Sequence, residues 1–289
     1  MVSVFRVLQA LLDGVEVATQ SYIKPGTYHR YSLDRDLTIY LRTVTAAMGR
    51  YFKAAELGPM VVKGEVGLPS LGLSNLIIQS VRDSLSKVGS NAPIHIHIPL
   101  ITLTTSSTMV LSKGRGVNLS DLWRTYLQVL SGTSWRDSVT FVKEIKRLGT
   151  ELSLAIDDLG ITTSRIEIEG LTLHELLQYL CNKVKDLRYV IKDLEPVRSA
   201  SNVIVNEYLR IGDLNIATVK AYITLLINEV PSGFRRSLSE LLRKDLGREE
   251  AKYLISLDKK LRSSGTRYDH LLTPLITSTY AALTVLYTR

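Results

Sequence analysis

Apolar residues recur every three to four positions along almost the whole chain, and this periodicity is the feature that most constrains the fold. The first apolar stripe falls within residues 2–20 and comprises Val4, Val7, Leu8, Leu11, Leu12 and Val15. Similar stripes recur in about ten further segments, each separated from the next by Gly, Pro, Ser or Asp. Helices joined by short connections bury such stripes against one another. The sequence therefore predicts an all-α fold, a single compact multi-helix domain of residues 1–289 with about ten or more helices.

The helical pattern has defined limits and three interruptions. We expect further helices from Asp34 or Asp36 to about residue 57, where Gly58-Pro59 would end the helix, and over residues 71–88, 119–130, 134–148, 172–194, 197–210, 216–230, 233–246, 249–263 and 271–287. Residues 94–98, Ile-His-Ile-His-Ile, alternate with period two, which is typical of a strand. Residues 101–111 fit either a buried helix or an extended stretch. Residues 151–170 are interpreted as a surface loop that could approach a ligand.

A turn after the first helix gathers residues suited to phosphate and metal chemistry. Pro25-Gly26 is a strong turn signal and would hold Lys24, His29 and Arg30 near one another. Lys and Arg side chains suit phosphate oxygens, and the carboxylates of Asp34 and Asp36 could hold a Mg²⁺ ion that bridges those phosphates. The structural alternative is a solvated turn in which Asp34 caps the next helix.

The composition of the chain bears on its subcellular location. The chain is 45% hydrophobic and 22% charged, as in ordinary globular proteins, and polar residues interrupt its apolar runs before the length of a membrane span. We therefore expect no transmembrane segment. A single cysteine permits no internal disulfide, and the N-terminus does not resemble a signal peptide. These features indicate a cytoplasmic protein.

The chain is basic, with a net charge of +8 and a pI near 9.4. This excess fits a polyanionic partner such as a nucleotide-type ligand, nucleic acid or an acidic protein. The basic residues are scattered along the chain, however, which is typical of a solvated surface and makes nucleic acid an unlikely partner. A homodimer through an apolar helix face remains open.

Several motifs of known chemistry are absent from the sequence. It contains no GxxxxGK[ST] loop, no GxGxxG after a strand and no GxSxG elbow. His95 and His97 would share one side of a strand and could bind a metal if a third ligand came from elsewhere, but neither HxxxH, CxxC nor HExxH accompanies them.

The opening of the chain resembles the triphosphoribosyl-dephospho-CoA synthase family. The match covers Lys24-Pro25-Gly26-Thr27-Tyr28-His29-Arg30, then Asp34, Asp36 and an apolar helix that reaches Phe52. Further correspondences extend thinly over nearly the whole chain, at Gly89-Ser90-Asn91 with Pro99-Leu100, at Leu171-Thr172-Leu173, at Lys185-Asp186-Leu187, at residues 231–236 and at residues 273–279. This family transfers a triphosphoribosyl group from ATP to dephospho-CoA and releases adenine.

The resemblance implies a site and a set of ligands. ATP and Mg²⁺ would be required, and nucleotide and CoA-like small molecules would be the partners. Phosphates would contact Lys24, His29, Arg30 and Arg236. Mg²⁺ would bind Asp34 and Asp36, and Asp186 is a further candidate site residue.

Departures from the family pattern open alternatives, and one of them lies in the middle segment, where Pro93, His95 and His97 replace a glycine-containing pattern. Leu275 replaces a glycine that would let the backbone approach a phosphate, and Thr279 replaces a carboxylate. The chain could therefore be an ATP-dependent transferase or a ligand-binding relative that has lost catalysis. The third alternative, suggested by charge alone, is a basic helical module that binds nucleic acid or protein.

Overall fold

The prediction of a compact all-α fold is confirmed. The computed structural model describes residues 2–32, 36–114 and 116–288, and its regular elements are all helical over these ranges. The α-helices are α1 (Val2–Gln20), α2 (Ile39–Ala46), α3 (Met48–Val62), α4 (Leu73–Val88), α5 (His97–Ser112), α6 (Leu119–Ser131), α7 (Trp135–Lys146), α8 (Glu151–Asp158), α9 (Thr163–Glu169), α10 (Leu173–Leu180), α11 (Glu195–Ile211), α12 (Leu214–Leu226), α13 (Ser232–Arg243), α14 (Arg248–Ser263) and α15 (Leu272–Thr288). Short helical turns are η1 (Leu68–Ser70), η2 (Ile94–Ile96), η3 (Lys185–Leu187), η4 (Arg188–Lys192) and η5 (Asp269–Leu271).

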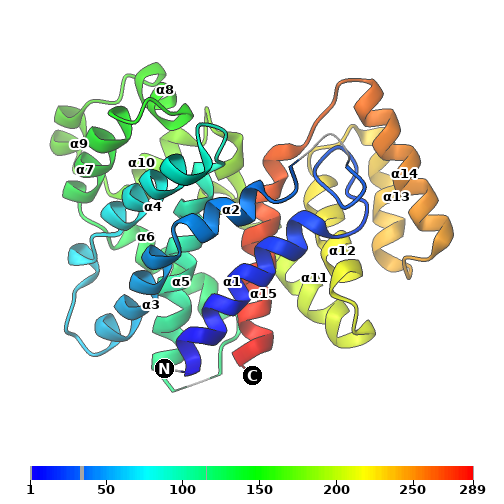
Figure 1. Ribbon diagram of the computed structural model, residues 1–289, viewed down its shortest axis with the longest axis horizontal. Coiled ribbons are helices and arrows are strands. Elements are labelled where there is room, and N and C mark those ends of the chain that lie inside the picture. Colours follow the sequence, from blue (N-terminus) through cyan, green and yellow to red (C-terminus); the bar gives the residue numbers. More distant parts are fainter. Residues whose placement is uncertain (1, 33–35, 115, 289) are drawn as a thin grey trace.

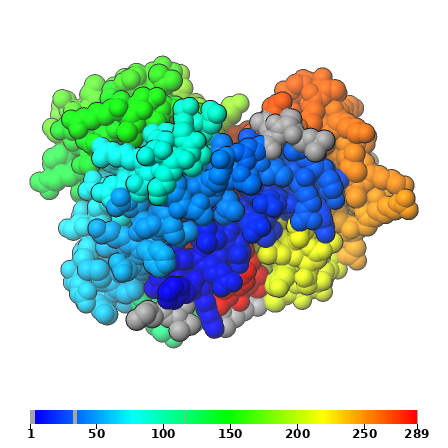
Figure 2. All heavy atoms as spheres, viewed as in Figure 1, coloured from blue at the N-terminus to red at the C-terminus, as the bar shows by residue number. Residues whose placement is uncertain are grey.

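Helices α1 and α15 lie side by side through the centre of the molecule (Figure 1). The Tyr287 hydroxyl donates a hydrogen bond of 2.8 Å to the Asp13 carboxylate and joins the two helices. Helices α3–α10 lie on one side of this pair and α11–α14 on the other. Figure 2 shows the same face as a solid surface with a hollow at its upper edge, between α7–α10 (green) and α13–α14 (orange).

The helices α5 and α15 form the centre of the core although both are rich in Thr and Ser. Their hydroxyls donate to carbonyl oxygens one turn earlier, as Thr102 does to Ile98 at 2.8 Å and Thr277 to Thr273 at 2.8 Å. A hydroxyl with such a partner can be buried at little cost, which is why residues 101–111 form a buried helix rather than an extended stretch.

Two stretches are long and apolar enough to cross a membrane, Ile94–Ser112 and Asp269–Thr288. The protein itself buries 94% of the first and 83% of the second. Both are therefore core helices by their surroundings, and the prediction that the chain has no transmembrane segment stays a prediction.

The strand expected at residues 94–98 is wrong. These residues form η2 and the first turn of α5. The period-two pattern misled because both the isoleucine and the histidine positions are buried, so the segment has no solvated face. The imidazoles of His95 and His97 are buried polar groups with partners of their own.

The loop expected at residues 151–170 is also wrong, because this segment forms α8 and α9. The Thr150 hydroxyl caps α8 by accepting from Ser153 N, and the Thr162 hydroxyl caps α9 by accepting from Arg165 N. The helix expected over residues 172–194 begins with the predicted capping box of Thr172 and Glu175 but ends at Leu180.

Gly58-Pro59 does not end a helix as expected. Helix α3 continues through Pro59 to Val62, while the break between α2 and α3 falls earlier, at Ala47. Gly58 is instead the point where α3 meets α5. A Cβ atom at this position would lie 2.6 Å from Met109 N and 2.7 Å from Thr105 O, and nearer still to the Thr108 hydroxyl.

We predict that Gly58→Ala destabilises the protein by about 2 kcal/mol or more, because the added methyl group must push α3 away from α5. Gly49→Ala is the matched control in the same helix, since a Cβ atom there meets nothing within 4 Å. This control should be neutral or up to about 1 kcal/mol more stable than the wild type, as expected for Ala in a helix. Chemical denaturation of the three proteins would measure the difference, and equal effects at the two sites would contradict the packing described for Gly58.

Candidate functional site

Lys24 lies inside the protein and not on its surface. Its side chain is fully buried, and the ammonium nitrogen donates to Ser21 Oγ at 2.8 Å, Ser21 O at 3.3 Å and Thr19 O at 3.4 Å. Burial, with a smaller contribution from the charge of Arg30, holds the Lys24 pKa well below its ordinary value. A phosphate could contact the Lys24 ammonium nitrogen only after that nitrogen left its hydrogen-bond partners.

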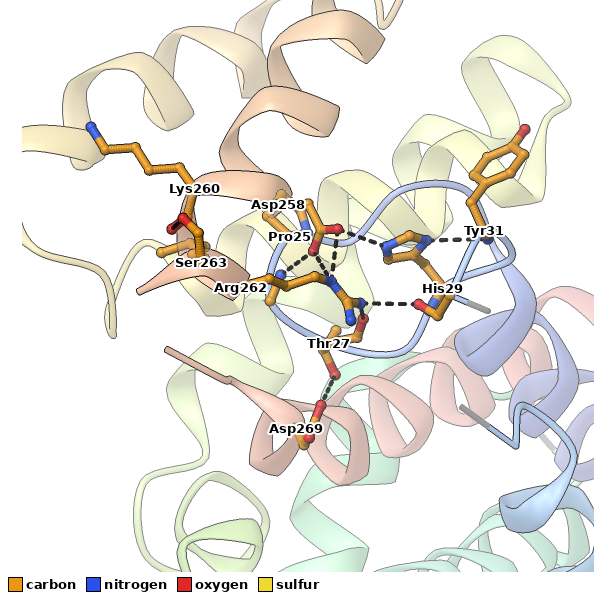
Figure 3. Close-up of polar contacts among 12 residues, drawn as sticks. Pro25, Thr27, His29, Tyr31, Asp258, Lys260, Arg262, Ser263 and Asp269 are labelled. Atoms are coloured by element: carbon orange, nitrogen blue, oxygen red, sulfur yellow. Dashed lines mark hydrogen bonds and ion pairs between the residues drawn. The ribbon is translucent and has the colours of Figure 1, made fainter. Parts of the chain in front are cut away.

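The loop after Lys24 is fixed by the carboxylate of Asp258 on α14 (Figure 3). Asp258 accepts from Gly26 N at 2.8 Å and from Arg262 Nε at 2.8 Å, and its second oxygen lies 3.3 Å from His29 Nε2. Tyr31 N donates to His29 Nδ1 at 3.2 Å, so the imidazole proton lies on Nε2 and faces Asp258. His29 is thus part of the loop's own hydrogen-bond network.

The same loop is connected to two other elements, α12 and the start of η5. Tyr222 of α12 donates to Pro25 O at 2.7 Å, Tyr268 N donates to Gly26 O at 2.9 Å, and the Thr27 hydroxyl donates to Asp269 at 3.2 Å. Gly26 has a φ of +79°, in the region that favours glycine, and a Cβ atom there would meet the Tyr268 ring at 2.9 Å. The predicted turn is therefore present, but it is packed rather than solvated.

Among the other residues proposed from the sequence, Arg30 lies near Lys24, because Ser21 O accepts from both Arg30 N and Lys24 Nζ. Arg30 is exposed, stacks over the Tyr22 ring at 5.3 Å and donates to Gln20 O. The Arg236 side chain is 92% exposed on α13 and pairs with Glu240. Asp36 accepts from the backbone and hydroxyl of Thr38 and pairs with Arg42, whereas Asp34 lies outside the described residues. Their roles in binding phosphate and Mg²⁺ stay predictions.

A second polar cluster joins three distant segments of the chain. His95 Nε2 of η2 lies 3.1 Å from Asp186 Oδ1 of η3 and 3.0 Å from the hydroxyl of Thr273 at the start of α15. No hydrogen bond to the other ring nitrogen, Nδ1, is present among the described residues. The Asp186 carboxylate can only accept, so it places the imidazole proton on Nε2 and the lone pair on Nδ1.

His95 and Asp186 shift each other's pKa. Burial lowers the pKa of His95, but the charge and hydrogen bond of Asp186, with the charge of Glu151, outweigh it and raise the pKa. Burial likewise raises the pKa of Asp186, but His95 and the charge of His270 outweigh it and lower the pKa. The two groups therefore favour a charged pair, in which the imidazole is a stronger base than usual.

His95 is also part of a cavity wall. The cavity has a volume of about 390 Å³, and its polar lining comes from Ser90, Asn91, His95, Thr150 and Glu151. The polar region continues from Asp186 to His270, whose charge acts on Asp186, and on to Glu229. Glu229 lies 3.7 Å from His270 Nε2 and accepts from the Tyr189 hydroxyl. An imidazole with a fixed tautomer beside a cavity of this size can exchange a proton with a bound small molecule.

His97 does not join His95 in a metal site. Its Nδ1 lies 2.8 Å from the Tyr51 hydroxyl and its Nε2 lies 2.8 Å from the Ser84 hydroxyl. Burial, with the nearby charge of His95, lowers its pKa to about 3, so it is neutral at physiological pH. Within the part of the chain that the structure describes, no three His, Cys, Asp or Glu residues are grouped so that they could hold a metal ion.

The sequence indicated Asp186 but not the other partners that organise the two clusters. Asp258 and Arg262 stand four positions apart on α14, a spacing that predicts a helix-face pair but not a contact with residue 26. Glu229 and His270 carry no local signal at all. The sequence pattern around His95 indicates only a possible metal ligand.

Comparison with known proteins supports a shared fold. No family model and no curated protein matches the sequence. Among solved structures, the fold is similar to that of a protein from Archaeoglobus fulgidus that is provisionally assigned as a triphosphoribosyl-dephospho-CoA synthase. The two chains superpose with a TM-score of 0.53 and 16% identity, over 86% of this chain and 98% of the other. At this identity the similarity shows the fold and not the activity.

We predict that Asp258→Asn lowers the stability at pH 7 by about 3 kcal/mol, because His29 and Arg262 lose their buried charge partner. The pKa of Asp258 is lowered in the folded protein, since His29, Gly26 and Arg262 together outweigh its burial. Its contribution is therefore present above the unfolded pKa of about 3.9 and is lost as the pH falls through the folded value.

Denaturation of both proteins between pH 7 and pH 3 would measure this effect. The stability gap between wild type and Asp258→Asn should narrow as the pH falls. Asp83→Asn is the control, because Asp83 pairs with Arg50 at a site where both side chains are about one-third exposed, and it should cost about 1 kcal/mol or less. A gap that is independent of pH would contradict the charge interaction.

Proposed function

We propose that this protein is a small-molecule transferase of the triphosphoribosyl-dephospho-CoA synthase type, which acts on a nucleotide and a CoA-like acceptor. The observation that carries the proposal is the contact of His95 with both Asp186 and Thr273. Asp186 and Thr273 come from segments that resemble that family, whereas His95 lies in the middle segment, where histidines replace the family's glycine-containing pattern; the three segments are about 90 residues apart. The similarity of fold to the Archaeoglobus protein supports the same proposal.

His95 has the geometry of a general base. Asp186 holds the proton on Nε2, so neutral His95 offers the Nδ1 lone pair to a hydroxyl group of an acceptor in the neighbouring cavity. His95 Nδ1 takes the proton of this hydroxyl group, which makes the hydroxyl oxygen a better nucleophile toward the ribose carbon that loses adenine. Asp186 then stabilises the imidazolium that forms.

The ATP phosphates would have to be bound by exposed cations such as Arg30 and Arg236, because Lys24 is buried. The described residues do not fit a Mg²⁺ site, since the carboxylate of Asp36 is already engaged by Thr38 and Arg42. We therefore assign to the described residues only the proton transfer at His95. A cytoplasmic location fits the single cysteine, Cys181, which is buried.

A second candidate function is favoured by the structure of α15. Leu275 and Thr279 are fully buried, and the Thr279 hydroxyl donates to Leu275 O at 2.8 Å. This turn therefore presents neither a free backbone nor a carboxylate to a ligand. A relative that binds nucleotide or CoA-like molecules without turnover is the consistent alternative.

We predict that His95→Asn lowers the rate of adenine release from ATP, with dephospho-CoA as the acceptor, by about 10²- to 10⁴-fold. Adenine is quantified chromatographically. In the wild type the rate should rise with pH through a pKa above the ordinary value of about 6.5, because His95 must be neutral. In Asp186→Asn the rise in rate should occur at lower pH, since the carboxylate that raises the pKa of His95 is gone.

The surface variant Asp83→Asn should retain the wild-type rate and pH profile. Calorimetric titration with ATP and with dephospho-CoA separates the two candidates, because binding without adenine release identifies a ligand-binding protein. A His95→Asn variant as active as the wild type would refute the role of His95, and absence of binding would refute both candidates.

A further inference from the structure

A cavity with a volume of about 630 Å³ lies between α6 and the first half of α11. Its polar wall comes from Arg124 and Gln128 of α6 and from Glu195, Arg198 and Asn202 of α11. It shares no lining residue with the cavity beside His95. The volume is within the range of small-molecule sites, about 300–1,000 Å³.

Two residues of this cavity wall each carry a buried donor atom without a hydrogen-bond partner. Trp123 Nε1 and Arg198 Nε both lack an acceptor, and Ser138 Oγ is the other unpartnered buried side-chain atom in the described ranges. Both Trp123, which is 2% exposed, and Arg198 line the cavity. Buried donors without acceptors are rare because each is costly, so two in one cavity wall indicate a missing acceptor.

The guanidinium of Arg198 is the group of this cavity that would bind an anion. Arg198 forms no ion pair within the described part of the chain, whereas Arg124 pairs with Asp121 at 3.3 Å. Glu195 contributes the opposing charge, at the first position of α11. A guanidinium with free donors binds carboxylate and phosphate oxygens through two parallel hydrogen bonds. The side chains of Leu119 and Leu127 add apolar surface beside these donors.

We propose that the cavity between α6 and α11 binds a small organic oxyanion, with its anionic group on Arg198 and its apolar body against Leu119, Leu127 and Trp123. The ligand's oxygens would supply the acceptors that Arg198 Nε and Trp123 Nε1 lack. This site is separate from the cavity beside His95 and does not depend on the function proposed for it.

The proposal can be tested by calorimetric titration of the full chain with phenyl phosphate, phenylacetate and benzyl alcohol. The two anions distinguish a phosphate site from a carboxylate site, and the neutral alcohol measures the contribution of the apolar body. At least one anion should bind with a Kd below about 1 mM, which is a weak but specific affinity. Benzyl alcohol should bind at least about 10-fold more weakly, since it lacks the charge-assisted hydrogen bonds.

Arg198→Gln should weaken the anion by about 10- to 100-fold, as expected for the loss of hydrogen bonds to a charged group. Trp123→Phe keeps the apolar ring but removes the Nε1 donor, and it should weaken binding by about 3- to 10-fold. Arg243→Gln, at an exposed position of α13, is the matched control and should bind as the wild type does.

Thermal melting monitored by circular dichroism establishes that each variant is folded. Anion binding that both Arg198→Gln and Trp123→Phe weaken, but Arg243→Gln does not, supports the site. Absence of binding by both anions up to 10 mM, or equal binding by wild type and Arg198→Gln, would overturn the proposal.

Discussion

The carboxylate of Asp258 is the interaction on which the arrangement of the N-terminal loop depends. It binds Gly26, His29 and Arg262 at once and so joins residues that are more than 200 positions apart. Two tyrosines, Tyr222 and Tyr268, complete the attachment through the backbone around Pro25. Because the loop follows α1 directly, the same contacts hold α12 and α14 against the loop at the C-terminal end of the central helix. The loop around Pro25-Gly26, which the sequence suggested as a phosphate-binding turn, therefore connects α1 to α12 and α14.

The cluster around His95 lies where three short segments meet, and none of them could form it alone. A buried imidazole and a buried carboxylate are each costly, but together they satisfy one another. The net result is a stronger base beside a cavity that can admit a small molecule. The cavity between α6 and α11 differs in kind, because there the donors are not satisfied within the protein.

The sequence predicted the fold class and most helices, because the apolar stripes of amphipathic helices are local signals. It failed at residues 94–98, where both faces are buried, and at residues 151–170, where short helices depend on caps such as Thr150 and Thr162. The sequence indicated a turn at Pro25-Gly26 but not the burial of Lys24. That burial, like the contact of His95 with Asp186, depends on residues far away in the chain, which composition and spacing do not encode.

The packing of α1 against α15 has a consequence for the order of folding during synthesis. Helix α1 leaves the ribosome well before its main partner, which follows about 270 residues later, as the hydrogen bond between Asp13 and Tyr287 marks. Until α15 emerges, the apolar face of α1 lacks its native cover and is open to chaperones or to other chains. Completion of the core is therefore a late and cooperative event, and a ribosome that stalls before α15 would release a chain with an exposed centre.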